Sequence, residues 1–302
     1  MAPKIAALVV TYNRKDLLRE TLKAILMQTF SINTLFVINN ASTDGTDKVL
    51  EEYKEKYSDK IKIVNLEENL GGAGGFNYGI HYIYNTFKYD WIWLMDDDAV
   101  PAENALETLF TYYNNLPKKK QNKIGVLQNK RVLDRKWFDE NNGKYFPLKA
   151  KKRWAGTFVG YLIKTEVVGK IGFPEKEFFI YSDDVEYTLR VRKMGYKTLT
   201  IFGSYIYHPT WTTQWDYIFK KRKIKIPGWK IYYVFRNPFL IYKNNEMIKF
   251  FLKIFFKFDA LIWKRIDPKL YPFALKGLKD GLNGIGGKVI KPGQKDIKEV
   301  SK

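Results

Sequence analysis

Cysteine is absent from this chain of 302 residues, and histidine occurs only twice. The lack of cysteine excludes disulfides and thiolate metal sites, and it is compatible with a reducing compartment. No stretch reaches the ~18 consecutive apolar residues expected of a membrane-spanning helix. The first residues, MAPKIAALVV, hold an apolar run too short for a signal peptide, with no small-residue cleavage pattern behind it. These absences predict a cytoplasmic protein.

Apolar residues are abundant, at 45% of the chain, which suits a globular protein of one large domain or two smaller ones. The positive charge is concentrated near one end. Residues 217–302 hold 21 Lys or Arg and 6 Asp or Glu, which accounts for +15 of the net charge of +20. Such a tail can meet nucleic acid, anionic lipid or an acidic substrate. The composition shifts to Lys, Phe, Ile, Tyr and Trp beyond about Thr213, so we place a domain boundary there.

The first half of the chain alternates between short apolar strands and helical segments. Strands are predicted at 4–10, 34–38, 61–65 and 91–95, with helical periodicity between them. This alternation implies a parallel sheet covered by helices on both faces. Ligands of such sheets bind beyond the carboxyl ends of the strands, where the polar ends of these four strands fall. A glycine-rich turn is expected after the third strand, before the next helix. Beyond residue 124 the pattern loosens into strands at 126–128, 158–164, 178–181 and 197–201 and a helix at 185–194.

Three aspartates, Asp96, Asp97 and Asp98, follow the fourth strand directly. Adjacent carboxylates at a buried strand end repel one another, and a divalent cation with a preference for oxygen ligands relieves that repulsion. Residues two apart project the same way from an extended segment, so Asp96 and Asp98 can share one ion while Asp97 faces elsewhere. The competing interpretation is a solvated acidic turn in which one aspartate caps a helix.

Six short motifs decide between these interpretations. They are VVTYNR (9–14), NNASTDGT (39–46), NLGGAGGFNYG (69–79), MDDDA (95–99), WAGTFVG (154–160) and FFIYSDDVEYTLR (178–190). In this order they resemble the family 2 glycosyltransferases, most of all the galactofuranosyltransferases and next the rhamnosyltransferases. The resemblance implies a GT-A type, Rossmann-like α/β fold: a mixed, mostly parallel sheet flanked by helices. It also implies that residues 1–123 bind the nucleotide sugar and 124–213 the acceptor.

The same resemblance assigns a metal and a donor site. Asp96 and Asp98 would bind Mn²⁺ or Mg²⁺ at the donor diphosphate, with His208 as third ligand, although a lone histidine before proline is often structural. The donor-binding residues it implies are Thr11, Tyr12, Arg14, Asn39, Asn40, Gly71, Gly72, Gly74, Asp96 and Asp97. The family usually has an aspartate where this chain has Asn39-Asn40. An amide can donate as well as accept, so UDP-sugars are favoured as donors while dTDP-sugars stay possible.

The acceptor side rests on two further motifs. The resemblance assigns the catalytic base, which deprotonates the acceptor hydroxyl, to Asp184, with Asp183 positioning the acceptor or taking the role itself. Helix capping by Ser182 or Asp183 is the simpler explanation of this acidic pair. Acceptor binding is assigned to Trp154, Gly156 and Thr157 at the start of a strand, although a core position would explain Trp154 equally well.

The basic tail, residues 214–302, is predicted to be helical and rich in aromatic residues. In the segment 247–265, MIKFFLKIFFKFDALIWKR, four lysines fall within roughly an 80° arc and apolar side chains cover most of the rest. This pattern is typical of a helix that lies on an anionic membrane surface. A helix packed onto the catalytic domain, with solvated lysines, would give the same pattern.

Together these features predict a metal-dependent inverting hexosyltransferase. It would move a sugar, galactofuranose in the first instance, from a nucleotide to a glycan or lipid-linked glycan in cell-surface polysaccharide synthesis. It would be peripheral on the inner face of the cell membrane. A dTDP-rhamnose-dependent enzyme is the alternative. A non-catalytic sugar-binding or nucleic-acid-binding protein does not need a metal pair and a separate base, so no nucleic acid partner is expected.

Overall fold

The computed structural model describes residues 2–209 and 226–297 and divides them into two compact units. The sheet unit takes in the chain up to Leu70, Gly75–Pro174 and Asp184–Pro209. The helical unit takes in Gly71–Gly74, Glu175–Asp183 and the described residues beyond 225. The boundary predicted near Thr213 falls within 210–225, outside the described residues. The sequence did not predict that two short segments from the first part of the chain join the helical unit.

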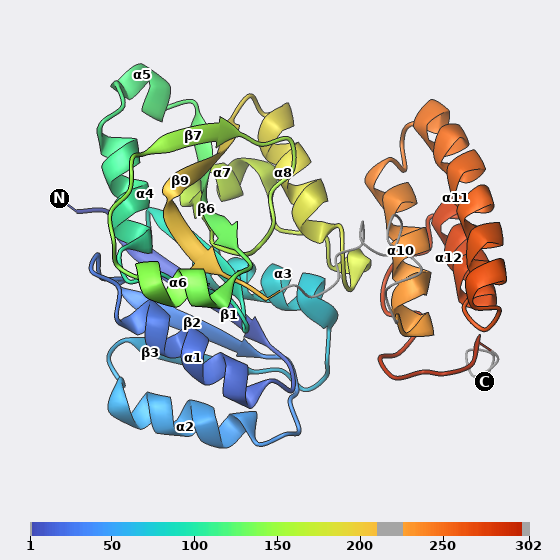
Figure 1. Cartoon of the computed structure of the whole chain (residues 1–302), viewed down its shortest axis with the longest axis horizontal. Helices are drawn as coiled ribbons and strands as arrows, with labels where there is room; N and C mark the ends of the chain where they lie inside the picture. The colour runs from blue at the N-terminus through green and yellow to red at the C-terminus, as the bar shows by residue number, and fades with distance from the viewer. Residues whose placement is uncertain (1, 210–225, 298–302) are drawn as a thin grey trace. The chain divides into compact units, whose positions relative to one another are not determined.

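The sheet unit is built on a mixed sheet of nine strands in the described part of the chain (Figure 1). The order is β3-β2-β1-β4-β8-β6-β9-β5, and β7 pairs with β9. The strands are β1 Ile5–Thr11, β2 Thr34–Asn39, β3 Ile61–Asn65, β4 Trp91–Asp96, β5 Val100–Pro101, β6 Ile124–Val132, β7 Lys149–Lys152, β8 Tyr161–Lys164 and β9 Lys197–Tyr207. The first four run parallel, and β8 lies antiparallel between β4 and β6. The predicted α/β class with a mixed sheet is confirmed.

Helices cover both faces of this sheet because side chains alternate along each strand. Ile5, Ala7 and Val9 of β1 belong to one buried cluster, and Ala6 and Leu8 to the other. The helices of this unit are α1 Lys15–Leu26, α2 Thr46–Lys56, α3 Gly71–Thr86, α4 Ala105–Asn114, α5 Lys118–Gln121, α6 Arg135–Asn141, α7 Thr165–Ile171 and α8 Asp183–Lys193. Helices α1, α2, α4 and α6 contribute to the first cluster, whereas α3, α7 and α8 contribute to the second. The first residues of α3 and α8 belong to the helical unit.

The helical unit contains α10 Gly228–Ile241, α11 Glu246–Ile266, α12 Tyr271–Leu282 and the 3₁₀-helix η1 Lys176–Phe178. Two glycines of α12 permit its close packing on α10: a Cβ at Gly277 would collide with a carbonyl of α10, and one at Gly281 would lie 2.7 Å from the Arg236 carbonyl. Helix α11 adds the buried Phe256, Ala260 and Trp263 to this core. None of the described helices is both long and apolar enough to span a bilayer.

Three local predictions were wrong. The segment 178–181, predicted as a strand, is the end of η1 followed by residues with left-handed backbone. The segment 154–157 does not begin a strand, since β8 starts at Tyr161. The glycine-rich stretch expected as a turn before a helix is instead the first turn of α3. In each case a long-range contact decides the local conformation.

Candidate active site

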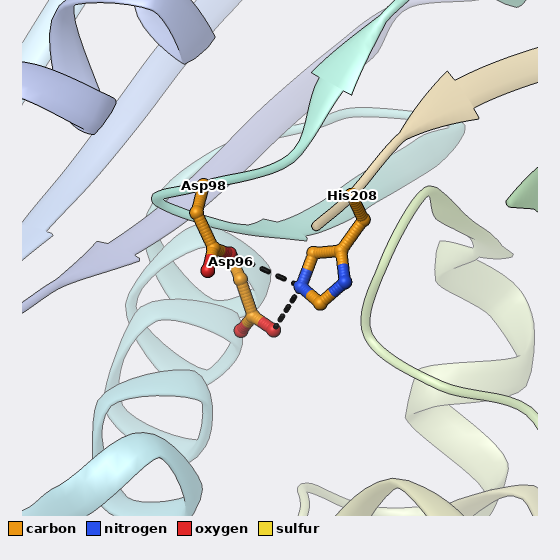
Figure 2. Close-up of side chains that lie close together, drawn as sticks. All are labelled: Asp96, Asp98 and His208. Carbon is orange, nitrogen blue, oxygen red and sulfur yellow. Dashed lines mark ion pairs between the residues drawn. The ribbon is translucent and has the colours of Figure 1, made fainter. Parts of the chain in front are cut away.

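The acidic cluster lies where β4 ends, and strand pairing brings His208 to it. Asp96 is the last residue of β4, and Asp97 and Asp98 form the turn that leads into β5. Because Val100 of β5 pairs with Tyr207 of β9, the residue after β9 comes to lie beside this turn. Nε2 of His208 is 3.1 Å from Oδ1 of Asp98 and 3.8 Å from Oδ2 of Asp96 (Figure 2). The structure thus brings together the three residues predicted as metal ligands.

These three side chains fit a divalent cation. One ligand atom of each lies within 4.8 Å of the others. Oδ1 of Asp98 is buried, and Nε2 of His208 lies 3.1 Å from it, so one cation could bind both atoms. Burial and the neighbouring Asp98 raise the pKa of Asp96 to about 8, so a second negative charge is costly here. Burial would also raise the pKa of Asp98, but His208 and Arg14 lower it below its usual value. A cation among two carboxylates and an imidazole relieves the repulsion and occupies the buried oxygen.

Asp97 ties the end of β1 to that of β4. Its Oδ2 accepts hydrogen bonds from the Thr11 hydroxyl (2.9 Å) and the Tyr12 backbone N–H (3.2 Å), while Oδ1 lies 3.3 Å from Nη1 of Arg14. Arg14 also contacts Oδ2 of Asp98 at 2.7 Å. These contacts give Asp97, which the resemblance assigns to donor binding, a role in local structure as well. Tyr12 is 38% exposed, which leaves its ring accessible to a ligand.

Asn39 and Asn40, predicted to contact the donor base, brace neighbouring loops. Asn39 Nδ2 donates to Oδ1 of Asn65, which joins the ends of β2 and β3. Asn40 donates to Asn69 and accepts from the Leu70 backbone N–H at 2.8 Å. Both side chains are almost fully buried, so their first role is to fix the polar ends of β2 and β3.

The glycines of α3 have different roles. A Cβ at Gly71, which has φ +74°, would collide with Phe179 of the helical unit, whereas a Cβ at Gly72 would meet nothing within 4 Å. A Cβ at Gly75 would collide with Val10 of β1. Gly71 and Gly75 are thus needed for packing, and Gly72 leaves backbone open to a ligand. Gly74 lies in the same first helical turn.

Residues 175–182, which we call the base loop, lead directly into the predicted catalytic base. Phe179, Tyr181 and Ser182 have φ of 61°, 66° and 70°, values that non-glycine residues seldom adopt. Asp183 is buried at the start of α8, and Asp184 follows it with a half-buried side chain. Burial raises the pKa of Asp184 to about 6, although the Val185 backbone N–H donates to its Oδ1 and favours the anion. A carboxylate with this pKa can accept a proton near neutral pH.

The segment 154–157, predicted to bind the acceptor, packs against α8. The Gly156 backbone N–H donates to Oγ1 of Thr188, and a Cβ at Gly156 would come 2.5 Å from the Tyr161 ring. The Thr157 carbonyl accepts from the Gln128 amide. Side chains thus satisfy this backbone in place of a strand partner, which explains why no strand forms. Trp154 is 54% exposed, so it is not a core residue.

Arg236 and Asn237 of α10 were missed by the sequence reasoning. Both are fully buried, and both donate hydrogen bonds to carbonyls of the base loop. The sequence held a signal, since this polar pair interrupts the otherwise apolar run 231–241, IYYVFRNPFLI. A buried arginine needs a specific reason to be there.

Comparison with known protein families identifies the family to which the chain belongs. The family described as "Glycosyl transferase family 2" matches residues 6–159, half of the chain. The chain belongs to this family. It is therefore a glycosyltransferase, as predicted. Galactofuranosyltransferase GlfT1 of Mycolicibacterium smegmatis is 26% identical over 235 residues, covering 70% of this chain and 72% of the relative. GlfT1 of Mycobacterium tuberculosis is 25% identical over 295 residues, covering 89% and 92%.

Solved structures support the GT-A fold. The mannosyltransferase PcManGT from Pyrobaculum calidifontis, in complex with GDP-Man and Mn²⁺, aligns with a TM-score of 0.58 at 15% identity. The alignment covers 93% of this chain and 88% of that one. Staphylococcus aureus TarS 1-349, in complex with UDP-GlcNAc, also gives 0.58, at 18% identity, covering 93% and 81%. At these identities the likeness concerns the fold alone.

Proposed function

We propose that this glycosyltransferase transfers a sugar, with inversion, from a nucleotide donor to a hydroxyl of a glycan or lipid-linked glycan in cell-surface polysaccharide synthesis. The observation that carries the proposal is the cluster of Asp96, Asp98 and His208 at the ends of β4 and β9. UDP-galactofuranose is the donor we favour, because GlfT1 relatives match along most of the chain. The Mn²⁺ and nucleotide sugars of the GT-A neighbours agree with a metal-bound nucleotide donor.

The residues divide the reaction between them. Asp96, Asp98 and His208 would hold Mn²⁺ or Mg²⁺, which supplies positive charge for the departing diphosphate when bound. The Asp184 carboxylate takes the proton of the acceptor hydroxyl. The oxygen of that hydroxyl bonds to the anomeric carbon as the bond to the diphosphate oxygen breaks, and the nucleoside diphosphate leaves. Trp154 offers an exposed ring on which a sugar face can stack.

The test is release of nucleoside diphosphate by the purified chain. UDP-galactofuranose and dTDP-rhamnose are compared at equal concentration, with Mn²⁺, with Mg²⁺ and with EDTA, in the presence of glycoside and lipid-linked acceptors. We expect turnover of UDP-galactofuranose that EDTA abolishes. Turnover of dTDP-rhamnose alone would replace the donor assignment, and equal turnover in EDTA would refute the metal site.

We also propose that α11 binds an anionic membrane surface. Phe256, Ala260 and Trp263 pack in the helical unit, but the opposite side of α11 is apolar too. At 100° per residue the exposed side chains centre roughly 180° from the packed ones. They are Met247, Phe250, Phe251, Ile254, Phe255, Phe258, Leu261 and Ile262, exposed by 43–70%. Lys253, Lys257 and Lys264 lie exposed along one flank. Packing therefore leaves a bulky apolar face bordered by positive charge, which suits the interface of an anionic bilayer.

Flotation of the full chain with phosphatidylcholine vesicles, with and without 30% phosphatidylglycerol, tests this second proposal. We expect flotation with the anionic vesicles and at least a tenfold loss in the double variant Phe251→Ser, Phe258→Ser, since each buried phenylalanine contributes about 1.5–3 kcal/mol. Met194→Ser, which removes an exposed apolar side chain of the sheet unit, is the matched control and should float like the parent. Unchanged flotation of the double variant would refute membrane binding through α11. Membrane binding would also be refuted if the parent were a dimer and the double variant a monomer, because a second copy of the chain would then cover the apolar face of α11.

A further inference from the structure

The strongest unexplained feature of the helical unit is the buried pair Arg236-Asn237. Arg236 Nη2 donates to the carbonyls of Glu177 and Phe178, both at 2.8 Å, and Nη1 donates to that of Gly287. Its Nε donates to Oδ1 of Asn237 at 2.8 Å. All four hydrogen bonds are to neutral oxygens, and the guanidinium also lies over the rings of Tyr232 and Tyr233, although a buried guanidinium is usually paired with a carboxylate.

Asn237 continues the same set of contacts along the base loop. Its Nδ2 lies 3.1, 2.6 and 2.8 Å from the carbonyl oxygens of Phe178, Ile180 and Tyr181, so two protons are shared among three acceptors. The pair together binds four consecutive or near-consecutive carbonyls of one loop. These are the carbonyls around the left-handed residues Phe179 and Tyr181. Hydrogen bonds from α10 therefore hold a backbone conformation that the loop sequence does not favour.

The other side of the base loop contacts the first turn of α3. The Phe179 carbonyl accepts from the Ala73 backbone N–H at 3.1 Å, and Gly71 packs against Phe179 with no room for a Cβ. The Phe179 ring lies on that of Tyr233 in α10, with centroids 5.1 Å apart. The loop is therefore held between α10 and the glycine-rich turn that the sequence assigns to the donor.

We propose that Arg236 and Asn237 are positioning residues for sugar transfer: they hold the base loop so that Asp183 and Asp184 meet the acceptor correctly. The inference rests on the proposed function, because it takes the acidic pair as the acceptor and base side of the site. It assigns the C-terminal helices a part in the reaction besides membrane binding. Removing these hydrogen bonds changes the direction of the carboxylate, while the metal ligands at the ends of β4 and β9 keep their positions.

The variants are made in the full chain. Asn237→Ala removes the donors to three loop carbonyls, and Asn237→Asp keeps the side-chain volume while removing the amide protons. Tyr232→Phe is the matched control, since it keeps the buried ring, whose centroid lies 5.5 Å from the Arg236 guanidinium, and removes the hydroxyl that donates to Asp280 of α12. For each variant we would measure the melting temperature, the binding of UDP with Mn²⁺, kcat for transfer and its pH profile.

We expect both Asn237 variants to lose at least fiftyfold in kcat, with UDP affinity within about threefold of the parent and the acidic limb of the pH profile displaced, effects that follow from misplacing the base alone. Tyr232→Phe should keep the parent's kcat and pH profile. The proposal is overturned if folded Asn237 variants retain parental kcat, or if Tyr232→Phe loses as much. It is also overturned if both Asn237 variants unfold outright, since the pair would then hold the fold and not the loop.

Hydrogen exchange separates this proposal from the proposed function. In Asn237→Ala the amides of residues 178–182 should exchange at least tenfold faster, while those of α12 stay as in the parent. This readout needs no turnover. Absent turnover by the parent chain would count against the proposed function. Unchanged exchange in the variant would count against a positioning role for Arg236 and Asn237.

Discussion

Replacing Asp96 by asparagine should make the metal-free protein more stable, although it removes a proposed ligand. Asp96, Asp97 and Asp98 are adjacent at the end of a buried strand, and burial and Asp98 raise the pKa of Asp96 to about 8. The folded protein thus holds this proton to a higher pH than the unfolded chain does. The stability of the parent should therefore fall as the pH rises from about 4 to 8. Asparagine has no charge to bury.

The magnitude follows from the pKa and the exposure of the side chain. A rise from 3.8 to about 8 would cost about 6 kcal/mol for a fully buried group, at about 1.4 kcal/mol per unit. The Asp96 side chain is 44% exposed, so solvent screening reduces the cost, and we expect about 2 kcal/mol at pH 8. For a chain of 302 residues this is about 3 °C in melting temperature. The advantage should shrink to well under 1 °C at pH 5.

Thermal unfolding in EDTA and in saturating Mn²⁺ measures both effects. In EDTA at pH 8, Asp96→Asn should melt above the parent. In Mn²⁺ the order should reverse, because a ligand at a hundred times its Kd adds about 2.7 kcal/mol to a protein that binds it. Asp59→Asn removes an exposed carboxylate in the loop before β3 and is the control for net charge; it should follow the parent in both conditions. A variant less stable than the parent in EDTA would refute the repulsion argument, and equal stabilisation by Mn²⁺ would refute the ligand role.

Three further predictions concern turnover and binding. Because the pKa of Asp184 is raised to about 6 and the carboxylate is the active form, kcat should fall about tenfold per unit as the pH drops below 6; a flat kcat profile from pH 5 to 8 would contradict its role as base. Asp184→Asn should lower kcat by about 10²–10⁴ while a titration with UDP and Mn²⁺ gives the parent's Kd; retained turnover would move the role to Asp183. His208→Gln should weaken Mn²⁺ binding about 10–100-fold in a calorimetric titration, and an unchanged Kd would make this histidine structural.

The sheet and its polar strand ends were predictable because they depend on local pattern. The strands at 4–10, 34–38, 61–65 and 91–95 each lie within one residue of the observed β1 to β4. The carboxyl ends of neighbouring parallel strands lie at the same edge of a sheet. The residues that follow β1 and β4 were therefore expected to be neighbours. The structure adds the hydrogen bonds of Thr11 and Tyr12 to Asp97, which settle which way this side chain faces.

The acceptor side was less predictable because distant residues determine its backbone. The aromatic run 178–181 has the composition of a strand, yet its left-handed residues are held by side chains 56–59 positions later in the chain. No local pattern encodes that contact. The start of β8 was misplaced for a similar reason, since the side chains of Thr188 and Gln128 hydrogen-bond to the backbone of 156–157 where a strand partner was expected.

The hydrogen bond from Arg236 to the Glu177 carbonyl also bears on how the enzyme folds during synthesis. During synthesis the base loop leaves the ribosome 59 residues ahead of the arginine that holds it. The strands can pair once β9 has emerged. The backbone conformation of the base loop is not fixed until α10 has followed. A nascent chain halted between β9 and α10 would thus carry a complete set of metal ligands and an unformed acceptor side. Emergence of α10, and not of the sheet, would then complete the acceptor side.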